Sequence, residues 1–438
     1  NLLRLAILGL ALLAVGSSAH ACGPFFPNNL LDRGDEAVLV APLADFAREL
    51  ERLKLATCRF DHVRATNGYA AQTCDAEMLD LTAALKRAKV SPEESARITE
   101  GHRVNRQKLS EYLVALDAWE SKAWMDADEN TPTRRGPAPV PPNFDEVPGL
   151  PGEFADYFEG ASVFQNPDAD EDAARIAWER LLARPAAERK YKSTWAAFML
   201  GKIKEETDDD KALEYYQMTR ELAKHGFADS TGLAAASIGW EARICYRNGE
   251  YGKAINLYLE QLAAGDTSAA TSLRLTALAA LDDPAQLQRL ATDPAARQVI
   301  TSYLVSWRGA GWSYEEEQKR SNELVIGWLN AIEAAEVKDV ELAEKLALAA
   351  YQGGAFDEAQ RWIKRSGSSL LAQWLQAKLL LRGGKVAPAA GLLAKVSRSF
   401  PPELPGTNAP VSFVETLSSE INPWDHDNIS IGKQVLGE

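Results

Sequence analysis

The residues of this chain that could do chemistry are four histidines beyond residue 21 and a few clustered carboxylates. His62, His102, His225 and His426 are widely separated in the sequence, so their spacing does not predict a shared site. The chain has no G-x-S-x-G, H-E-x-x-H or P-loop motif, and no G-x-G-x-x-G before a strand. We therefore predict a protein that is not an enzyme, with no catalytic residue, cofactor or metal.

Two acidic segments could bind a divalent cation. Residues 424–428 read Trp-Asp-His-Asp-Asn, and carboxylates and imidazoles are metal ligands. Adjacent side chains can face one ion only if the loop folds around it, so we favour a polar surface turn. Asp208, Asp209 and Asp210 lie at a predicted turn between helices. Solvated charge is the simpler interpretation there, with calcium binding as the alternative.

The cysteines predict one disulfide. Cys58 and Cys74 enclose 15 residues, a loop whose closure is worth roughly 3 kcal/mol in the chain-entropy model. We expect these two to pair, although four cysteines allow three complete pairings and Cys22 is also available. Cys245 lies in an apolar helical stretch and is expected to be a buried free thiol.

The charge and the N-terminal residues indicate an exported protein. Lys and Arg number 48 against 62 Asp and Glu, a net charge of −14, which argues against a nucleic-acid partner. The apolar run Leu5–Val15 precedes Ala19-His20-Ala21, the pattern of a signal peptide. We predict cleavage after Ala21 and a periplasmic or extracellular protein without a membrane span; an envelope lipoprotein anchored at Cys22 is the alternative.

The rest of the chain has the sequence pattern of consecutive helices, with most Pro and Gly residues between the predicted helices. Ser91-Pro92-Glu93-Glu94 has the cap, proline and acidic residue that begin a helix. Asp283-Pro284 and Asp293-Pro294 each read as a cap followed by a first helical residue. The expected organisation is a signal peptide (1–21), a small helical N-terminal domain (22–125), a Pro-rich linker (126–152), a run of helix pairs (153–400) and a Pro/Asn-rich tail (401–438).

One unit, residues 234–264, shows how consecutive helices would pack. Ala242 and Ala254 would lie where its two helices cross, because only small side chains allow a close approach. Gly249 can end the first helix in a left-handed conformation. The unit thus predicts a helix, a tight turn and an antiparallel second helix.

This unit resembles a tetratricopeptide repeat, and similar glycines and alanines recur along the chain. Gly354 and Gly384, like Ala359 and Ala389, are 30 residues apart. About five units match, whereas residues 267–339 match poorly. The residues expected to pack the repeats are Gly201, Ala212, Ala242, Gly249, Tyr251, Ala254, Tyr258, Gly354, Ala359, Gly384 and Ala389.

The resemblance implies an all-α protein, an α-α solenoid of degenerate tetratricopeptide-like helix pairs, with a generic helical bundle as the rival. It implies a groove formed by the first helix of each pair that binds a peptide or a helix. Lys202, Glu241 and Arg243 are the expected groove residues. We expect a non-catalytic protein–protein interaction scaffold of the bacterial cell envelope, with a protein or peptide partner. The alternative is a metal-dependent or enzymatic envelope protein with its site in the N-terminal domain or tail.

Overall fold

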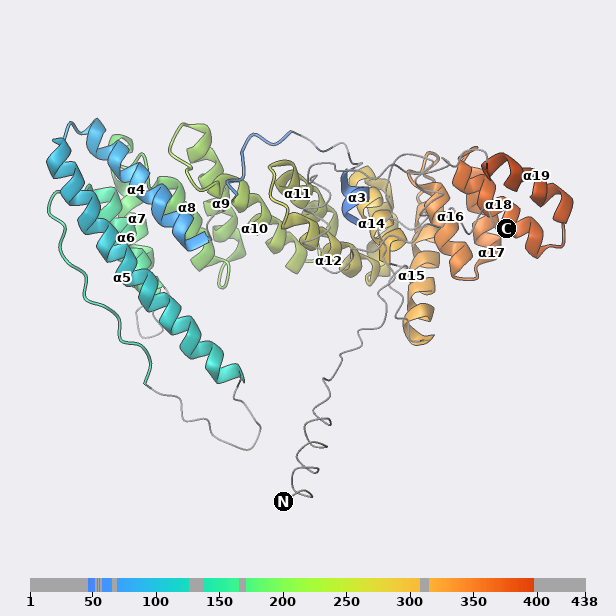
Figure 1. Cartoon of the computed structure of the whole chain (residues 1–438), viewed down its shortest axis with the longest axis horizontal. Coiled ribbons are helices and arrows are strands. Elements are labelled where there is room, and N and C mark those ends of the chain that lie inside the picture. Colours follow the sequence, from blue (N-terminus) through green and yellow to red (C-terminus); the bar gives the residue numbers. More distant parts are fainter. Residues whose placement is uncertain are drawn as a thin grey trace, which may run out of the picture. The chain divides into compact units, whose positions relative to one another are not determined.

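The computed structural model describes residues 46–51, 53, 55, 57–64, 69–125, 137–164, 171–307 and 315–397. Within these ranges every regular element is a helix and none is a strand, so the predicted all-α class is confirmed (Figure 1). The chain divides into two compact units: a middle unit of residues 55–276, and a C-terminal unit of residues 1–54 and 277–438. Of the described helices, none combines the length and the apolar character needed to cross a membrane.

In its described residues the middle unit contains eight complete α-helices, one short 3₁₀ turn at Ala186–Glu188 and the beginning of α12 (Ala269–Leu281). The helices are α4 (Tyr69–Arg87), α5 (Pro92–Met125), α6 (Gly152–Phe164), α7 (Glu171–Ala183), α8 (Ser193–Lys204), α9 (Asp209–Lys224), α10 (Leu233–Arg247) and α11 (Tyr251–Ala263). From α6 onward they form antiparallel pairs, α6 with α7, α8 with α9 and α10 with α11. The first helix α8 also contacts the first helices on either side, α6 and α10, so these three share one face.

In the C-terminal unit, too, helices that follow one another in the sequence pack in pairs. Its helices are α3 (Phe46–Glu51), α13 (Pro284–Thr292), α14 (Pro294–Trp307), α15 (Glu315–Ala334), α16 (Ala343–Gln352), α17 (Phe356–Arg365), α18 (Leu370–Arg382) and α19 (Val386–Ser397). The boundary at residue 276 lies within α12 (Ala269–Leu281). Helix α16 packs against α17 and α18 against α19, while α14, α16 and α18 contact one another in that order.

The pair α10–α11 shows why these residues form a tight helix hairpin. Gly249 has a φ of 74°, the left-handed region, and Glu250 donates its amide to the carbonyl of Cys245 to close the turn. Ala242 and Ala254 are fully buried between the helices. At α8–α9 a Cβ on Gly201 would meet the ring of Tyr216 at 2.6 Å, so only glycine fits there.

Helices α4 and α5 pack onto the helix pairs of the same unit. Leu81 and Leu85 of α4 and Ile98 of α5 form one apolar cluster with Phe154 of α6. A second cluster joins α5 to Phe158 of α6. The compact units divide the chain after residues 54 and 276, and the expected domain boundaries at 125, 152 and 400 stay predictions.

The described part of the Pro-rich segment, residues 137–151, contains no helix and packs along α5, to which it is hydrogen-bonded. Asn105 donates to the carbonyl of Asp145 at 2.8 Å and accepts the amide of Asp145 at 3.0 Å. The ring of Phe144 meets that of Phe158 edge-on, with centroids 4.9 Å apart. This stretch was expected to be a spacer, but its contacts make it part of the middle unit.

The predicted disulfide is wrong, because Cys58 and Cys74 are both free thiols. Cys74 is on α4 near Arg106, whereas Cys58 lies in the segment before α4, near Glu260 of α11. The spacing of 15 residues did not bring the two together because helix α4 fixes the direction of the second. Cys245 is free and buried, as expected. The predicted signal peptide, Cys22, residues 424–428 and the predicted tail lie outside the described residues.

Candidate functional site

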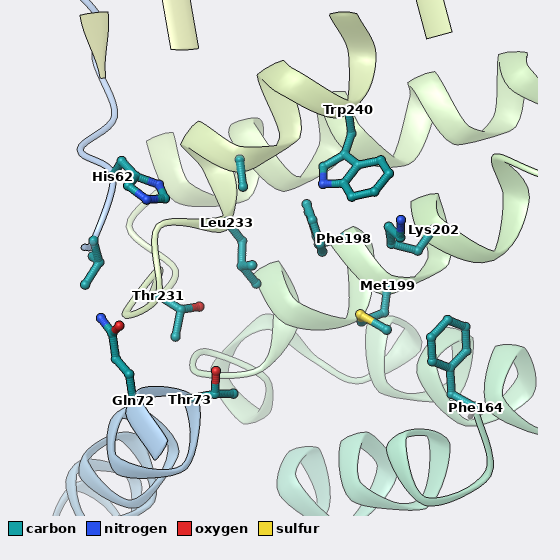
Figure 2. A pocket seen from close by; sticks show the side chains of 12 residues that line it. His62, Gln72, Thr73, Phe164, Phe198, Met199, Lys202, Thr231, Leu233 and Trp240 are labelled. Atoms are coloured by element: carbon teal, nitrogen blue, oxygen red, sulfur yellow. The ribbon is translucent and has the colours of Figure 1, made fainter. Parts of the chain in front are cut away.

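Two adjoining cavities of about 390 and 250 Å³ lie on the face formed by α6, α8 and α10 in the middle unit. Together we call them the inner groove. Figure 2 shows side chains of α8 and α10 on one side, with Gln72 and Thr73 of α4 and His62 of the preceding segment facing them. The residues that line both cavities are Thr73, Phe164, Phe198, Met199, Thr231 and Leu233.

The walls of the inner groove are mostly apolar. Phe164 ends α6, Phe198 and Met199 are in the middle of α8, and Trp240 is in α10. Phe164, Met199 and Trp240 are only partly buried against the core, so they leave apolar surface in the groove. Concave sites with aromatic walls and a few polar groups are typical of ligand-binding sites.

One end of the inner groove carries positive charge over an indole ring. The ammonium of Lys202 lies 3.0 Å from the centroid of Trp240, and Figure 2 shows the two side chains next to each other. The guanidinium of Arg243 lies 5.0 Å from the same centroid. Such cation–π contacts strengthen when water is excluded. Burial lowers the pKa of Lys202, opposed by Glu205, whose carboxylate is 3.8 Å from the ammonium.

Beneath the other end lies a charged cluster around the fully buried Glu77. Its carboxylate is 3.0 Å from Nε2 of His102, 2.9 Å from Nε of Arg106 and 3.6 Å from Nζ of Lys192. Arg106 also lines the smaller cavity. Loss of hydration alone would raise the pKa of Glu77, but Arg106, Lys192 and His102 together hold it well below its usual range.

Lys192 is the residue of this cluster whose charged form is disfavoured by burial. Its ammonium lies 3.4 Å from the ring centroid of Trp195, a wall of the smaller cavity, and is completely excluded from solvent. Burial lowers its pKa to about 8, against the attraction of Glu77, Asp80 and Glu153. Since Glu77 is on α4, Arg106 on α5 and Lys192 immediately before α8, the cluster joins the α4–α5 hairpin to the helix pairs.

The structure separates the three expected groove residues. Lys202 lines the inner groove, and Arg243 lies beside Trp240 with its side chain 51% exposed. Glu241 instead is buried in an ion pair with Arg220 of α9. Glu241 therefore does not line the inner groove: neighbouring positions on a helix point about 100° apart, which turns Glu241 toward the second helix of the preceding pair.

The histidines have separate surroundings. His62 lines the inner groove with Nδ1 3.7 Å from a carboxylate oxygen of Asp266, and His102 belongs to the Glu77 cluster. Nδ1 of His225 is 2.7 Å from the carbonyl oxygen of Glu221, as expected for a residue that caps a helix end. Across the described ranges there is no group of three or more His, Cys, Asp or Glu residues that could hold a metal ion.

Two of the three aspartates at the α8–α9 turn have structural roles. Asp208 caps α9 by accepting the amide of Lys211 at 3.0 Å. Asp209 binds the guanidinium of Arg247 at 2.7 Å. These contacts occupy Asp208 and Asp209, two of the three carboxylates at this turn.

The most unusual charged residues, Glu77 and Lys192, were not singled out from the sequence. Lys192 lies in the run Arg189-Lys190-Tyr191-Lys192, which reads as a solvated surface segment. Its burial depends on α4 and α5, about 100 residues earlier, so no local pattern could have revealed it.

No protein-family model matches this chain, and no curated protein is significantly similar to it in sequence.

Proposed function

We propose that this chain is a non-catalytic protein–protein interaction scaffold of the bacterial cell envelope, which binds a peptide or helix in the inner groove. The observation that carries the proposal is the groove itself, with its partly exposed aromatic residues on the shared face of α6, α8 and α10. The resemblance of the helix pairs to tetratricopeptide repeats favours the same use, since such repeats present their first helices to partners.

The chemistry of the inner groove favours a ligand with apolar and acidic parts. Phe164, Met199 and Trp240 offer apolar surface along its length. Lys202 and Arg243 place positive charge at one end, where an acidic side chain of the partner would find hydrogen-bond donors. The net charge of −14 acts over longer distances and favours the approach of a partner that is basic overall.

In this proposal the protein is exported by the signal peptide at residues 1–21 and acts in the periplasm or outside the cell. Anchoring through Cys22 is the alternative. Mass spectrometry of the mature N-terminus in the native host distinguishes them, since a free Cys22 rules out the lipid anchor.

The groove is tested by site-specific photocrosslinking in the full chain. We expect p-benzoylphenylalanine in place of Met199 to capture a defined partner from an envelope fraction. The same group in place of Met218, which is exposed on α9 and outside the groove, is the matched control. The captured protein, once purified, should bind wild-type chain at least ten times more tightly than the Trp240→Ala variant. Equal affinity would remove the inner groove as the binding site.

A further inference from the structure

In the C-terminal unit, a short helix from the N-terminal part of the chain covers the face of the first helices. Helix α3 packs on α14, and Figure 1 shows the two side by side. Because α14 contacts α16, and α16 contacts α18, these three form a continuous face that corresponds to the one bearing the inner groove in the middle unit.

Among the α3 side chains that the structure describes, three make the contact. Phe46 is buried with its ring edge-on to Tyr303 of α14, centroids 6.5 Å apart at 85°. Leu50 is completely buried one turn later. Between them, the carboxylate of Glu49 forms a buried ion pair with the ammonium of Lys345 on α16. The spacing i, i+3, i+4 places all three on one side of the helix.

We propose that this face is a binding site for an amphipathic helix of another protein, and that α3 is its displaceable internal occupant. The partner helix carries an aromatic residue, a glutamate three positions later and a leucine four positions later, the pattern of Phe46, Glu49 and Leu50. The proposal concerns the C-terminal unit and does not depend on the inner groove.

The length of α3 supports displacement. It has six residues, and isolated helices shorter than about 12 residues are marginal in water, so docking is what keeps α3 helical. A longer partner helix that carries the same three side chains would make the same three contacts and would be more stable as a helix than α3. It must compete with an attached occupant whose effective concentration is on the order of millimolar, which makes binding selective for good matches.

Lys345 supplies the specificity. Its side chain is 4% exposed, so an occupant without a carboxylate would leave a buried ammonium without its counter-charge. A helix with an apolar residue or a lysine at the position of Glu49 is therefore rejected. The site selects the acidic group together with the two apolar anchors.

The test uses the full chain and a fluorescent peptide of residues 42–54. We expect fluorescence anisotropy to show at least tenfold tighter binding to the Phe46→Ala, Leu50→Ala double variant than to wild type, in which the internal helix competes. Adding Lys345→Glu to the double variant should abolish the binding, and a peptide with Glu49→Lys should restore it.

Absence of binding to a double variant that is folded by circular dichroism would overturn the proposal, because α3 would then be a fixed part of the unit. Binding that Lys345→Glu leaves unchanged would overturn it as well. If the double variant melts below the assay temperature, the same titrations are made with Glu49→Ala, which removes only the carboxylate. Trp240→Ala in the middle unit serves as the control and should leave peptide binding unchanged, so this test and that of the inner groove fail independently.

Discussion

Lys192 has a buried ammonium whose protonation is linked to folding. It titrates near pH 10.5 in the unfolded chain and near 8 in the folded protein. Between these values the unfolded chain binds the extra proton, so this residue makes the free energy of unfolding rise with pH. The complete rise is about 3 kcal/mol for a shift of this size. Below pH 8 both states are charged, and the contribution is constant.

We therefore expect the difference in unfolding free energy between wild type and Lys192→Met to change in favour of wild type from pH 8 to pH 10. Urea unfolding at several pH values measures it. Comparing two variants at each pH cancels the cysteines and tyrosines, which titrate in the same range in both proteins. Parallel curves would show that Lys192 keeps an ordinary pKa in the folded protein.

The surroundings of Lys192 also show what a single sequence conceals at the scale of residues. Small residues at helix crossings, such as Ala242 and Ala254, could be found because the helical period fixes where they must lie. The charged partners of Lys192 come from α4 and α5, and no spacing rule connects them to it. Glu241 is one position from the groove-lining Trp240, but a step of one residue turns the side chain by about 100°, and the partner it meets there, Arg220, is 21 residues earlier in the sequence.

At the scale of helices, the approach of α8 to α9 depends on the missing side chain of Gly201. A methyl group there would come within 2.6 Å of the Tyr216 ring. That ring is fully buried, and its hydroxyl donates to Glu205 at 3.0 Å, so it has little freedom to move. We expect Gly201→Ala to lower the free energy of unfolding by about 1–3 kcal/mol, as overpacking usually does.

Thermal or urea unfolding measures this change. Gly391 is the control, because it is an exposed residue of α19 and a Cβ there has no neighbour within 4 Å. Gly391→Ala should be neutral or stabilising by up to about 1 kcal/mol, since alanine is the better helix former. If both variants lost the same stability, close packing at Gly201 would not be the cause.

Helix ends were the elements that the sequence predicted best. The Ser91 hydroxyl accepts the amide of Glu94 at 3.2 Å and α5 begins at Pro92, as the capping pattern indicated. Helices α13 and α14 begin at Pro284 and Pro294. These signals are local, since cap and first turn are adjacent in the chain. The docking of the Pro-rich segment on α5 was missed because it depends on Asn105, 40 residues before Asp145.

At the scale of the whole molecule, domain boundaries also depend on contacts between residues that are far apart in the sequence. A change in composition near residue 126 predicts a domain boundary there, and this stays a prediction. The compact unit of residues 55–276 runs through that position, because compact units follow buried contacts rather than composition. Phe154 and Phe158 of α6 are covered by α4 and α5. Without this hairpin the helix pairs would expose both rings, together with the ammonium of Lys192.

We therefore expect a fragment of residues 55–281 to unfold cooperatively, and one of residues 152–281 to lack a cooperative transition and to bind a hydrophobic dye. Circular dichroism during thermal unfolding, with dye fluorescence, distinguishes them. The hairpin also supplies Thr73 and Arg106 to the inner groove, so the shorter fragment should lose affinity for a groove partner even where it remains helical. Cooperative unfolding of residues 152–281 alone would mean that the α4–α5 hairpin is an accessory to the groove and not part of the unit that forms it.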